Sequence, residues 1–312
     1  MPNEKKIQKW SAGLVYLIIV LIFGFLAQKI SSSWSKVSDL RLTFRPGLLC
    51  VSIFFLTSYF FILSLLWELI TRKVGLILPL RKTIYYWFLS QLGKYVPGKI
   101  VFMISRAYFY KKEGFRISLT ASSFILESVA GVISLSLLSL VLIAHHVARE
   151  IVYLIPVVLS AIFFFHPKVV ERMVSFLNQR LGRQPITLGV KTTDWIVLNC
   201  LYGVSFFLLA GGAFFFFCKS IISVNGEQAL FLVGALGLSG ALGMIAFFTP
   251  SGLGVREGAL FFLLCKVMPE TEAAVISIAS RAWMMCSELF LIAVVYGIFR
   301  FGSIVAAREK YE

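Results

Sequence analysis

The amino-acid sequence predicts an all-α polytopic membrane protein, with about six transmembrane helices and two oppositely oriented re-entrant hairpins in an inverted repeat. Composition is the first reason, because 59% of the 312 residues are hydrophobic, 14% are charged and the mean hydropathy is +0.87. Soluble domains are closer to half apolar and a quarter charged. The second reason is that several apolar runs reach the roughly 20 helical residues that cross a hydrocarbon core about 30 Å thick. The third is that lysines and arginines, in excess by a net charge of +15, gather in the short intervals between these runs.

The charge distribution sets the expected topology and partners. Short loops rich in Lys and Arg usually stay cytoplasmic, so we interpret the positive charge as a topology signal and expect no nucleic-acid partner. The same charge would hold anionic lipid headgroups nearby. We expect a multi-pass protein of the cell (plasma or inner) membrane with both termini in the cytoplasm. The longest polar interval, 166–191, is too short for a soluble domain, so residues 1–312 are predicted to form a single transmembrane domain. Assembly as a homo-oligomer stays open.

Six spans are predicted along the chain. The first, 11–28, follows three lysines and is interpreted as an uncleaved signal anchor, with a cleavable signal peptide as the alternative. The other five spans are predicted at 46–70, 118–143, 151–165, 193–217 and 273–299. With the N-terminus inside, the clearest basic clusters then lie on the cytoplasmic side, namely 72–82, 106–116, 166–192 and 300–310.

The segment 83–104 is predicted to be the first re-entrant hairpin. Basic clusters flank it on both sides, so both of its ends favour the same face of the membrane. It contains "QLGKYVPGKI", in which Pro97 and Gly98 can form the tip of the hairpin. Non-helical backbone at membrane depth is tolerated only where protein buries it or where it lines a wet cavity. We therefore expect Lys94 and Lys99 to face a cavity, although both could instead extend to the membrane interface.

The segment 229–268 is predicted to be the second hairpin. Its apolar run is interrupted by a cluster of helix-breaking and charged residues, namely Pro250, Gly252, Gly254, Arg256 and Glu257. It ends at "PETE", which carries acid and no base, so this hairpin enters from the face opposite to the first. Each hairpin lies between two spans, which gives a first repeat over 46–143 and a second over 193–299 in opposite orientation. Broken helices that meet near the midplane are typical of alternating-access transporters, so we expect the two breaks to form one binding site.

Five charged residues in the later spans and the second hairpin bear on that site. Glu127, near the middle of its span, could pair with a hairpin lysine to gate transport or carry a proton, or it could form a structural ion pair. Arg256 and Glu257 could flank a headgroup or simply neutralise each other. Arg281 and Glu288 lie on one face of the last span, about two turns apart. We expect Arg281 to contact a phosphate and Glu288 to be structural.

Two motifs resemble a known family. "GKYVPGKI" followed by "SRAYFYKKEGF", together with the later "TPSGLGVREGAL", is similar to the pattern of the lysylphosphatidylglycerol synthase transmembrane-region, or flippase-like, membrane proteins. The resemblance covers essentially the whole chain. The family has a Pro-Gly segment with a downstream Arg in its first half and Pro-x-Gly-x-Gly-x-x-Glu in its second. The matching residues here are Pro97, Gly98 and Arg106, and then Pro250, Gly252, Gly254 and Glu257.

The chain departs from its relatives at two points. Some relatives have a Glu-Arg pair with an Asp soon after it, where this chain has Glu127, Ser128 and Gly131. Relatives that synthesise aminoacylated phosphatidylglycerol also carry a soluble catalytic domain that this sequence lacks. What the resemblance implies is therefore the flippase part, which moves an anionic phospholipid or a polyprenyl-phosphate-linked group between leaflets. It does not identify the substrate.

The sequence contains little that would support catalysis or hold a cofactor. "GLGVREG" has the wrong glycine spacing for a dinucleotide loop and no βαβ context. His145 and His146 are adjacent, without companion ligands at metal spacing. We expect no enzymatic activity, no metal and no cofactor, and transport that is passive or ion-coupled, with Glu127 as the candidate proton carrier. A small-solute or ion-coupled secondary transporter is the main alternative function, and a membrane-embedded enzyme of lipid metabolism is a more distant one.

Overall fold

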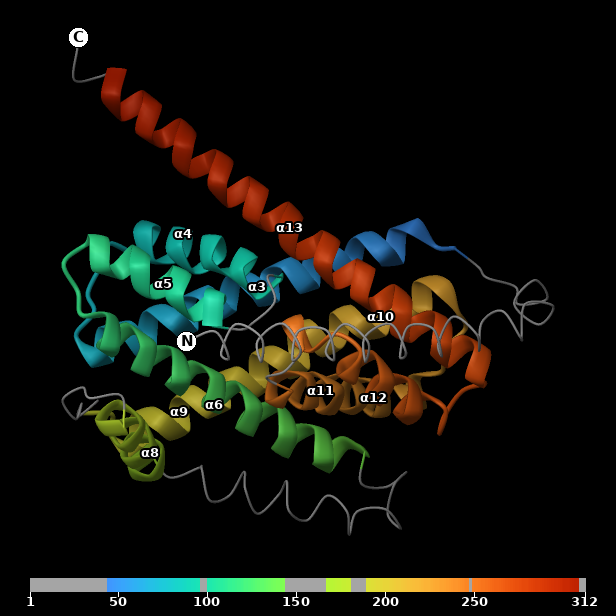
Figure 1. Ribbon diagram of the computed structural model, residues 1–312. Helices are drawn as coiled ribbons and strands as arrows, with labels where there is room; N and C mark the ends of the chain where they lie inside the picture. The colour runs from blue at the N-terminus through green and yellow to red at the C-terminus, as the bar shows by residue number, and fades with distance from the viewer. Residues whose placement is uncertain (1–43, 96–99, 144–166, 181–188, 247–248, 309–312) are drawn as a thin grey trace, which may run out of the picture.

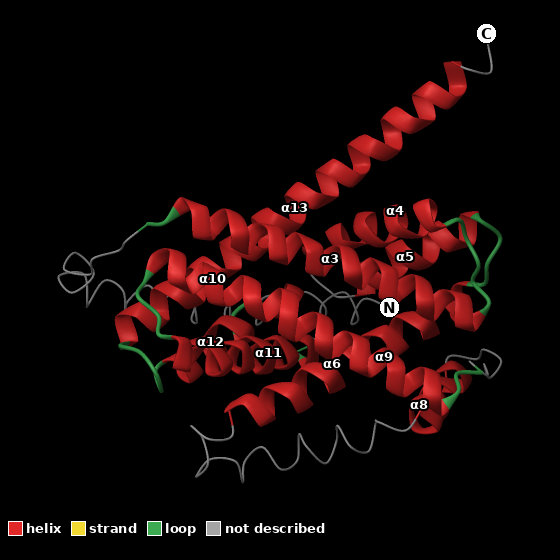
Figure 2. Cartoon of the chain, turned by 180° about the vertical axis from the view of Figure 1, so that it is seen from behind, coloured by secondary structure: helices red, strands yellow, loops and turns green. Residues whose placement is uncertain are grey.

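The computed structural model describes residues 44–95, 100–143, 167–180, 189–246 and 249–308. Every regular element in these ranges is helical, which confirms the predicted all-α class (Figures 1 and 2). The α-helices lie at α3 (Pro46–Val74), α4 (Leu80–Gln91), α5 (Ile100–Lys112), α6 (Ile117–Ile143), α8 (Pro167–Arg180), α9 (Thr192–Ser205), α10 (Gly212–Ile221), α11 (Ala229–Ile245), α12 (Val255–Leu264) and α13 (Glu270–Arg308). Shorter elements lie at η1 (Leu92–Tyr95), η3 (Phe206–Gly211), η4 (Gly226–Gln228) and η5 (Pro250–Gly252).

Five helices in the described part of the chain are long and apolar enough to cross a membrane. Four of them correspond to predicted spans, namely α3, α6, the continuous helix α9–η3–α10 and α13. The predicted spans 11–28 and 151–165 lie outside the described residues. The last helix is longer than predicted, because α13 begins three residues earlier and continues to Arg308, beyond the other helices (Figure 1). The protein is therefore a multi-pass membrane protein.

The first predicted hairpin, 83–104, folds back on itself as the pair α4 and α5. The two ends of this pair meet, because Lys82 Nζ lies 2.9 Å from a carboxylate oxygen of Glu113 and Tyr86 donates a 2.6 Å hydrogen bond to the same carboxylate. The Tyr86 ring also stacks on Phe109 with a centroid distance of 5.0 Å. At the opposite end of the pair, Gly93 of η1 lies against α5 so closely that a Cβ would be 2.8 Å from Phe102 Cα.

The second predicted hairpin, 229–268, repeats this arrangement with the pair α11 and α12. Gln228 Nε2 donates a 2.8 Å hydrogen bond to the Val267 carbonyl, which joins the start of α11 to the end of α12. In the break, Ser251 and Gly252 have positive φ values of 52° and 70°. Gly252 lies against α11, where a Cβ would be 2.7 Å from the Gly243 carbonyl oxygen. In each pair, hydrogen bonds therefore join the two helix ends opposite the break, and a glycine packs closely at the break.

Helix length bears on whether these pairs are re-entrant. α4 and α5 have 12 and 13 residues, so each is about 18–20 Å long and too short to cross a hydrocarbon core of about 30 Å. α12, with 10 residues, is shorter still. However, η4 and α11 together (226–245) are long and apolar enough to cross the membrane, so the length of α11 does not itself indicate a re-entrant helix. That both pairs enter and leave one face of the membrane stays a prediction, as does the inverted relation of the two repeats.

Interhelical packing brings the two pairs together. α6 packs along α11, α3 packs along α10, and η1 contacts η5. Buried hydroxyls join neighbouring helices: Ser52 Oγ of α3 donates to the Ala213 carbonyl at 2.7 Å, and Ser134 Oγ of α6 contacts the Asn199 carbonyl at 3.0 Å. Such polar contacts stabilise helix pairs in a membrane, where lipid competes equally for apolar side chains. The result is a bundle in which the two breaks contact each other.

Gly252→Ala should destabilise the second pair. The added methyl group meets the Gly243 carbonyl, and alanine at a φ of 70° is strained, so we expect a loss of about 1–3 kcal/mol and a lower Tm in detergent. Gly297→Ala in α13 is the matched control, because a Cβ there meets nothing within 4 Å. Equal melting temperatures for the two variants would contradict the close packing at the break.

Glu113→Gln should remove a pH-dependent contribution to stability. Hydrogen bonds from Tyr86 and Lys82 hold the pKa of the Glu113 carboxyl below its ordinary value of 4.5. A lowered folded-state pKa means that the stabilisation is present above the unfolded pKa and is lost as pH falls through the folded pKa. Wild type should therefore melt above the variant at pH 7, and the two should converge as the pH falls through the lowered pKa of Glu113. Glu227→Gln, at an exposed position, is the control, and its melting temperature should stay close to that of wild type across this pH range.

Candidate functional site

Buried charged side chains gather in two places around the breaks. We call the first the Arg106 cluster, which comprises Arg106, Glu127, Trp87 and Ser90 with the rings around them. We call the second the junction cluster, because it joins η1 to η5, α12 and α13. Its charged members are Lys94, Arg256, Glu257, Arg281 and Glu288.

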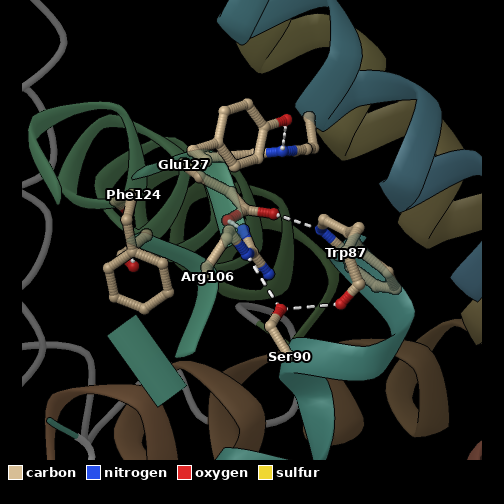
Figure 3. Close-up of polar contacts among 8 residues, drawn as sticks. Trp87, Ser90, Arg106, Phe124 and Glu127 are labelled. Carbon is tan, nitrogen blue, oxygen red and sulfur yellow. Dashed lines mark hydrogen bonds and ion pairs between the residues drawn. The ribbon is translucent and has the colours of Figure 1, made fainter. Parts of the chain in front are cut away.

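The Arg106 cluster connects α4, α5 and α6 through a buried ion pair. Arg106 is fully buried and its Nη1 pairs with Glu127 Oε2. The other Glu127 oxygen accepts a 2.8 Å hydrogen bond from Trp87 Nε1, and Arg106 Nε donates to Ser90 Oγ at 3.0 Å. Figure 3 shows Arg106 held between Glu127 and Ser90, with the Trp87 indole directed at the carboxylate.

Aromatic rings enclose the Arg106 guanidinium. Its Cζ lies 4.3 Å from the Trp67 ring centroid, 4.9 Å from Phe102 and 5.4 Å from Phe124. A guanidinium over ring faces gains cation–π attraction, which is strongest where water is excluded. Arg106 is therefore enclosed in the bundle, whereas Lys111, Lys112 and Arg116 of the predicted basic cluster 106–116 are exposed, and the cytoplasmic side of that cluster stays a prediction. The charge of Arg106 is neutralised inside the bundle because the helical turn of α5 directs it toward α6 and α3.

Glu127 is held as a structural ion pair in this arrangement. Both of its oxygens have partners, and neither partner is the hairpin lysine considered from the sequence. Lys94, the hairpin lysine in the described residues, instead pairs with Glu288. Buried ion pairs fix geometry more than they add stability, because desolvation offsets much of the attraction. The Arg106 cluster thus sets how α4 and α5 lie against α6.

The junction cluster begins at the break of the first pair. Lys94 Nζ and Tyr95 Oη, both from η1, donate to the two carboxylate oxygens of Glu288 on α13. Glu288 is 1% exposed, so this carboxylate depends on the two donors for its stabilisation. The first break is thereby attached to the last helix, 193 residues or more away in sequence.

The break of the second pair contributes two more charges. Glu257 Oε2 accepts a 2.7 Å hydrogen bond from the Gly254 N–H, which satisfies backbone at the start of α12. Arg281 Nη1 donates to the Ser251 carbonyl at 3.3 Å and lies 3.7 Å from Glu257 Oε1. Arg281 and Glu257 therefore support the non-helical backbone of η5 with their side chains.

Positive charge exceeds negative charge in this cluster. Among the described residues it has three cations (Lys94, Arg256 and Arg281) and two carboxylates (Glu257 and Glu288). Arg256 Nη1 donates to a thioether, Met284 Sδ, at 2.8 Å, and the two guanidinium groups repel each other. Nε and Nη2 of Arg281 are buried without a hydrogen-bond partner in the described part of the chain. Donors of this kind suit an anion with several acceptor oxygens.

The predicted site residues divide between these two places. The structure brings Lys94, Arg256, Glu257 and Arg281 together, beside Gly252 and Gly254 in the break and Pro250 at the start of η5. It places Arg106 and Glu127 in the separate enclosed cluster. Pro97, Gly98 and Lys99 lie outside the described residues.

Sequence reasoning missed three contributors to the junction cluster and assigned Glu288 to structure alone. The missed residues are Tyr95, Ser251 (through its carbonyl) and Met284. The spacing of seven between Arg281 and Glu288 was the available signal, since it places both on one face of α13. Among the described residues, no group of three or more His, Cys, Asp and Glu side chains is arranged to hold a metal ion.

Comparison with known protein families supports the resemblance that the two sequence motifs indicate. The family described as "Lysylphosphatidylglycerol synthase TM region" matches residues 11–287. The chain belongs to this family. No curated protein and no solved structure matches the chain. As a member of the lysylphosphatidylglycerol synthase TM region family, the protein is a membrane protein related to lipid handling, and the match contains both breaks and α13 as far as residue 287.

Arg106→Met and Glu127→Met should be strongly coupled in unfolding measurements. The single change Arg106→Met leaves a buried carboxylate without its cation, which typically costs about 3–5 kcal/mol. Adding Glu127→Met removes the unpaired charge, so the double variant should be more stable than Arg106→Met alone. Chemical denaturation in detergent, followed by tryptophan fluorescence, measures all four corners of the cycle. Simple additivity of the two changes would show that the pair in Figure 3 does not act as a unit.

Proposed function

We propose that this protein is a flippase-like transporter that moves an anionic lipid or lipid-linked group between the leaflets of the membrane. The headgroup, a phospholipid phosphate or the phosphate of a polyprenyl carrier, binds at the junction cluster between the two predicted re-entrant hairpins. Family membership supports a role in lipid handling. We further propose that the protein acts without chemistry on its substrate, in the cell membrane, with both termini cytoplasmic.

One observation carries this proposal: the junction cluster holds unbalanced positive charge and unpartnered guanidinium donors in a buried position. Arg281 is 8% exposed, and two of its donor nitrogens have no partner in the described ranges. Guanidinium groups bind phosphate through paired N–H donors, and such charge-assisted bonds are about twice as strong as neutral ones. A phosphate would supply both the missing charge and the missing acceptors.

The surroundings of the cluster favour a lipid over a free anion. On α13, Glu288 is buried, whereas the next two residues, Leu289 and Phe290, are 42% and 62% exposed. On α12, Glu257 is buried and Phe262 is 64% exposed. Exposed large apolar side chains on a membrane protein face acyl chains. Exposed apolar side chains therefore lie on the same two helices as the buried charges, which supports a ligand whose headgroup binds in the cluster while its tails stay in the bilayer.

Arg281→Gln should reduce leaflet exchange of anionic lipids. The experiment reconstitutes the full chain in proteoliposomes with fluorescent phosphatidylglycerol, phosphatidylcholine, polyprenyl phosphate or a sugar-linked polyprenyl phosphate, and measures access to an external quencher. Loss of charge-assisted hydrogen bonds should slow exchange of the anionic substrate by at least about tenfold. The exposed Arg116→Gln is the matched control and should exchange lipid like wild type.

The outcomes separate the candidate functions. Exchange of one lipid class that Arg281→Gln abolishes and Arg116→Gln preserves supports the flippase and names its substrate. Equal losses of anionic and zwitterionic exchange would make Arg281 structural only. Absence of exchange for every lipid, in protein that melts cooperatively, would overturn the proposal in favour of a small-solute or ion-coupled transporter.

A further inference from the structure

The two carboxylates of the junction cluster have different attachments. Glu257 accepts the Gly254 N–H at 2.7 Å, so its position is part of the backbone fold at the start of α12. In the described part of the chain, Glu288 accepts from two side chains, Lys94 and Tyr95, which come from a different element, η1. Removing the Glu257 charge would disturb the break itself. Removing the Glu288 charge changes the electrostatics of the site while its neighbours keep their backbone contacts.

Glu288 faces positive charge from η1, from α12 and from its own helix, α13. Lys94 pairs with it from η1, Arg256 on α12 attracts it electrostatically, and Arg281 lies about two turns before it on α13. Tyr95 contributes a neutral donor. Glu288 therefore occupies the place of an anion in a cluster of cations, and it neutralises one of their charges.

We propose that Glu288 is a built-in counter-charge that restricts the headgroup to one negative charge, and so selects a phosphodiester over a phosphomonoester. This inference rests on the proposed function, because it assumes that the headgroup phosphate binds at the junction cluster. With Glu288 ionised, the described residues of the cluster leave one positive charge unbalanced. A phosphodiester carries one negative charge and balances it. A phosphomonoester carries close to two above about pH 7, so its second charge would be buried unpaired beside the Glu288 carboxylate.

Glu288→Gln tests this selection directly. Glutamine keeps the size of the side chain and one oxygen that accepts from Lys94 or Tyr95, but it lacks the charge. Purified full-length protein in detergent is titrated at about pH 8 with fluorescent phosphatidylglycerol, phosphatidic acid or phosphatidylcholine, so that phosphatidic acid is mostly doubly charged. Wild type should bind phosphatidylglycerol more tightly than phosphatidic acid. In Glu288→Gln the ratio of the two Kd values should shift toward phosphatidic acid by about tenfold or more.

Three companion variants define the control and the rescue. Lys94→Gln removes a positive charge, so it should weaken binding of phosphatidic acid more than binding of phosphatidylglycerol. The double variant Lys94→Gln with Glu288→Gln restores the original charge balance and should return the Kd ratio toward that of wild type. Glu68→Gln is the matched control, because Glu68 is also a buried carboxylate in an ion pair, in its case with Arg72 outside the junction cluster, and it should leave the ratio unchanged.

The outcomes distinguish failure of this inference from failure of the proposed function. If folded wild type binds no anionic lipid, the proposed headgroup site is wrong and the counter-charge is overturned with it. A second outcome is that wild type binds anionic lipid and Arg281→Gln does not, which supports the headgroup site. If the ratio of the Kd values for phosphatidylglycerol and phosphatidic acid is then the same in wild type, Glu288→Gln and Lys94→Gln, only the counter-charge is overturned. Should Glu288→Gln fail to fold, the ratio in Lys94→Gln decides, since an unchanged ratio there overturns the inference.

Discussion

Backbone that leaves the helical ladder inside a membrane must find its hydrogen-bond partners within the protein, and this constraint organises the whole fold. The second break satisfies it with charged side chains: Glu257 accepts the Gly254 N–H, and Arg281 donates to the Ser251 carbonyl. At the first break, η1 packs against η5 of the second. The helices outside the two pairs surround this contact. The charged side chains that satisfy the broken backbone are thus buried beside the second break.

The two buried clusters have opposite characters. In the Arg106 cluster, the single cation is matched by a single carboxylate and has a hydroxyl partner and ring faces around it, while its Nη2 has no hydrogen-bond partner among the described residues (Figure 3). In the junction cluster, cations outnumber carboxylates and Arg281 retains unpartnered donors among the described residues. The first arrangement holds α4 and α5 against α6. The second leaves unused binding capacity at the place where elements from both halves of the chain meet.

The sequence predicted the all-α class, four described spans and the positions of both breaks, because long apolar runs and Gly-Pro interruptions are local signals. It also predicted that Lys94, Arg256, Glu257 and Arg281 belong together, since their positions flank the breaks. It did not predict that Arg106 would be buried or that Glu288 would pair with Lys94. Those contacts depend on how α5 and α13 are rotated against their neighbours, which side-chain packing decides and local composition does not. The second half of the predicted tip, including Pro97 and Lys99, lies outside the described residues.

The charge balance of the junction cluster also bears on how transport would respond to the membrane potential. Moving one elementary charge across the membrane costs or releases about 2.3 kcal/mol per 100 mV. With a phosphodiester bound, the described charges of the cluster, Glu288 included, sum to zero. A rearrangement that carries this loaded cluster through the bilayer would therefore do almost no electrical work. The unloaded cluster keeps one positive charge, so it is the return step that would be electrogenic and set by the voltage of the cell.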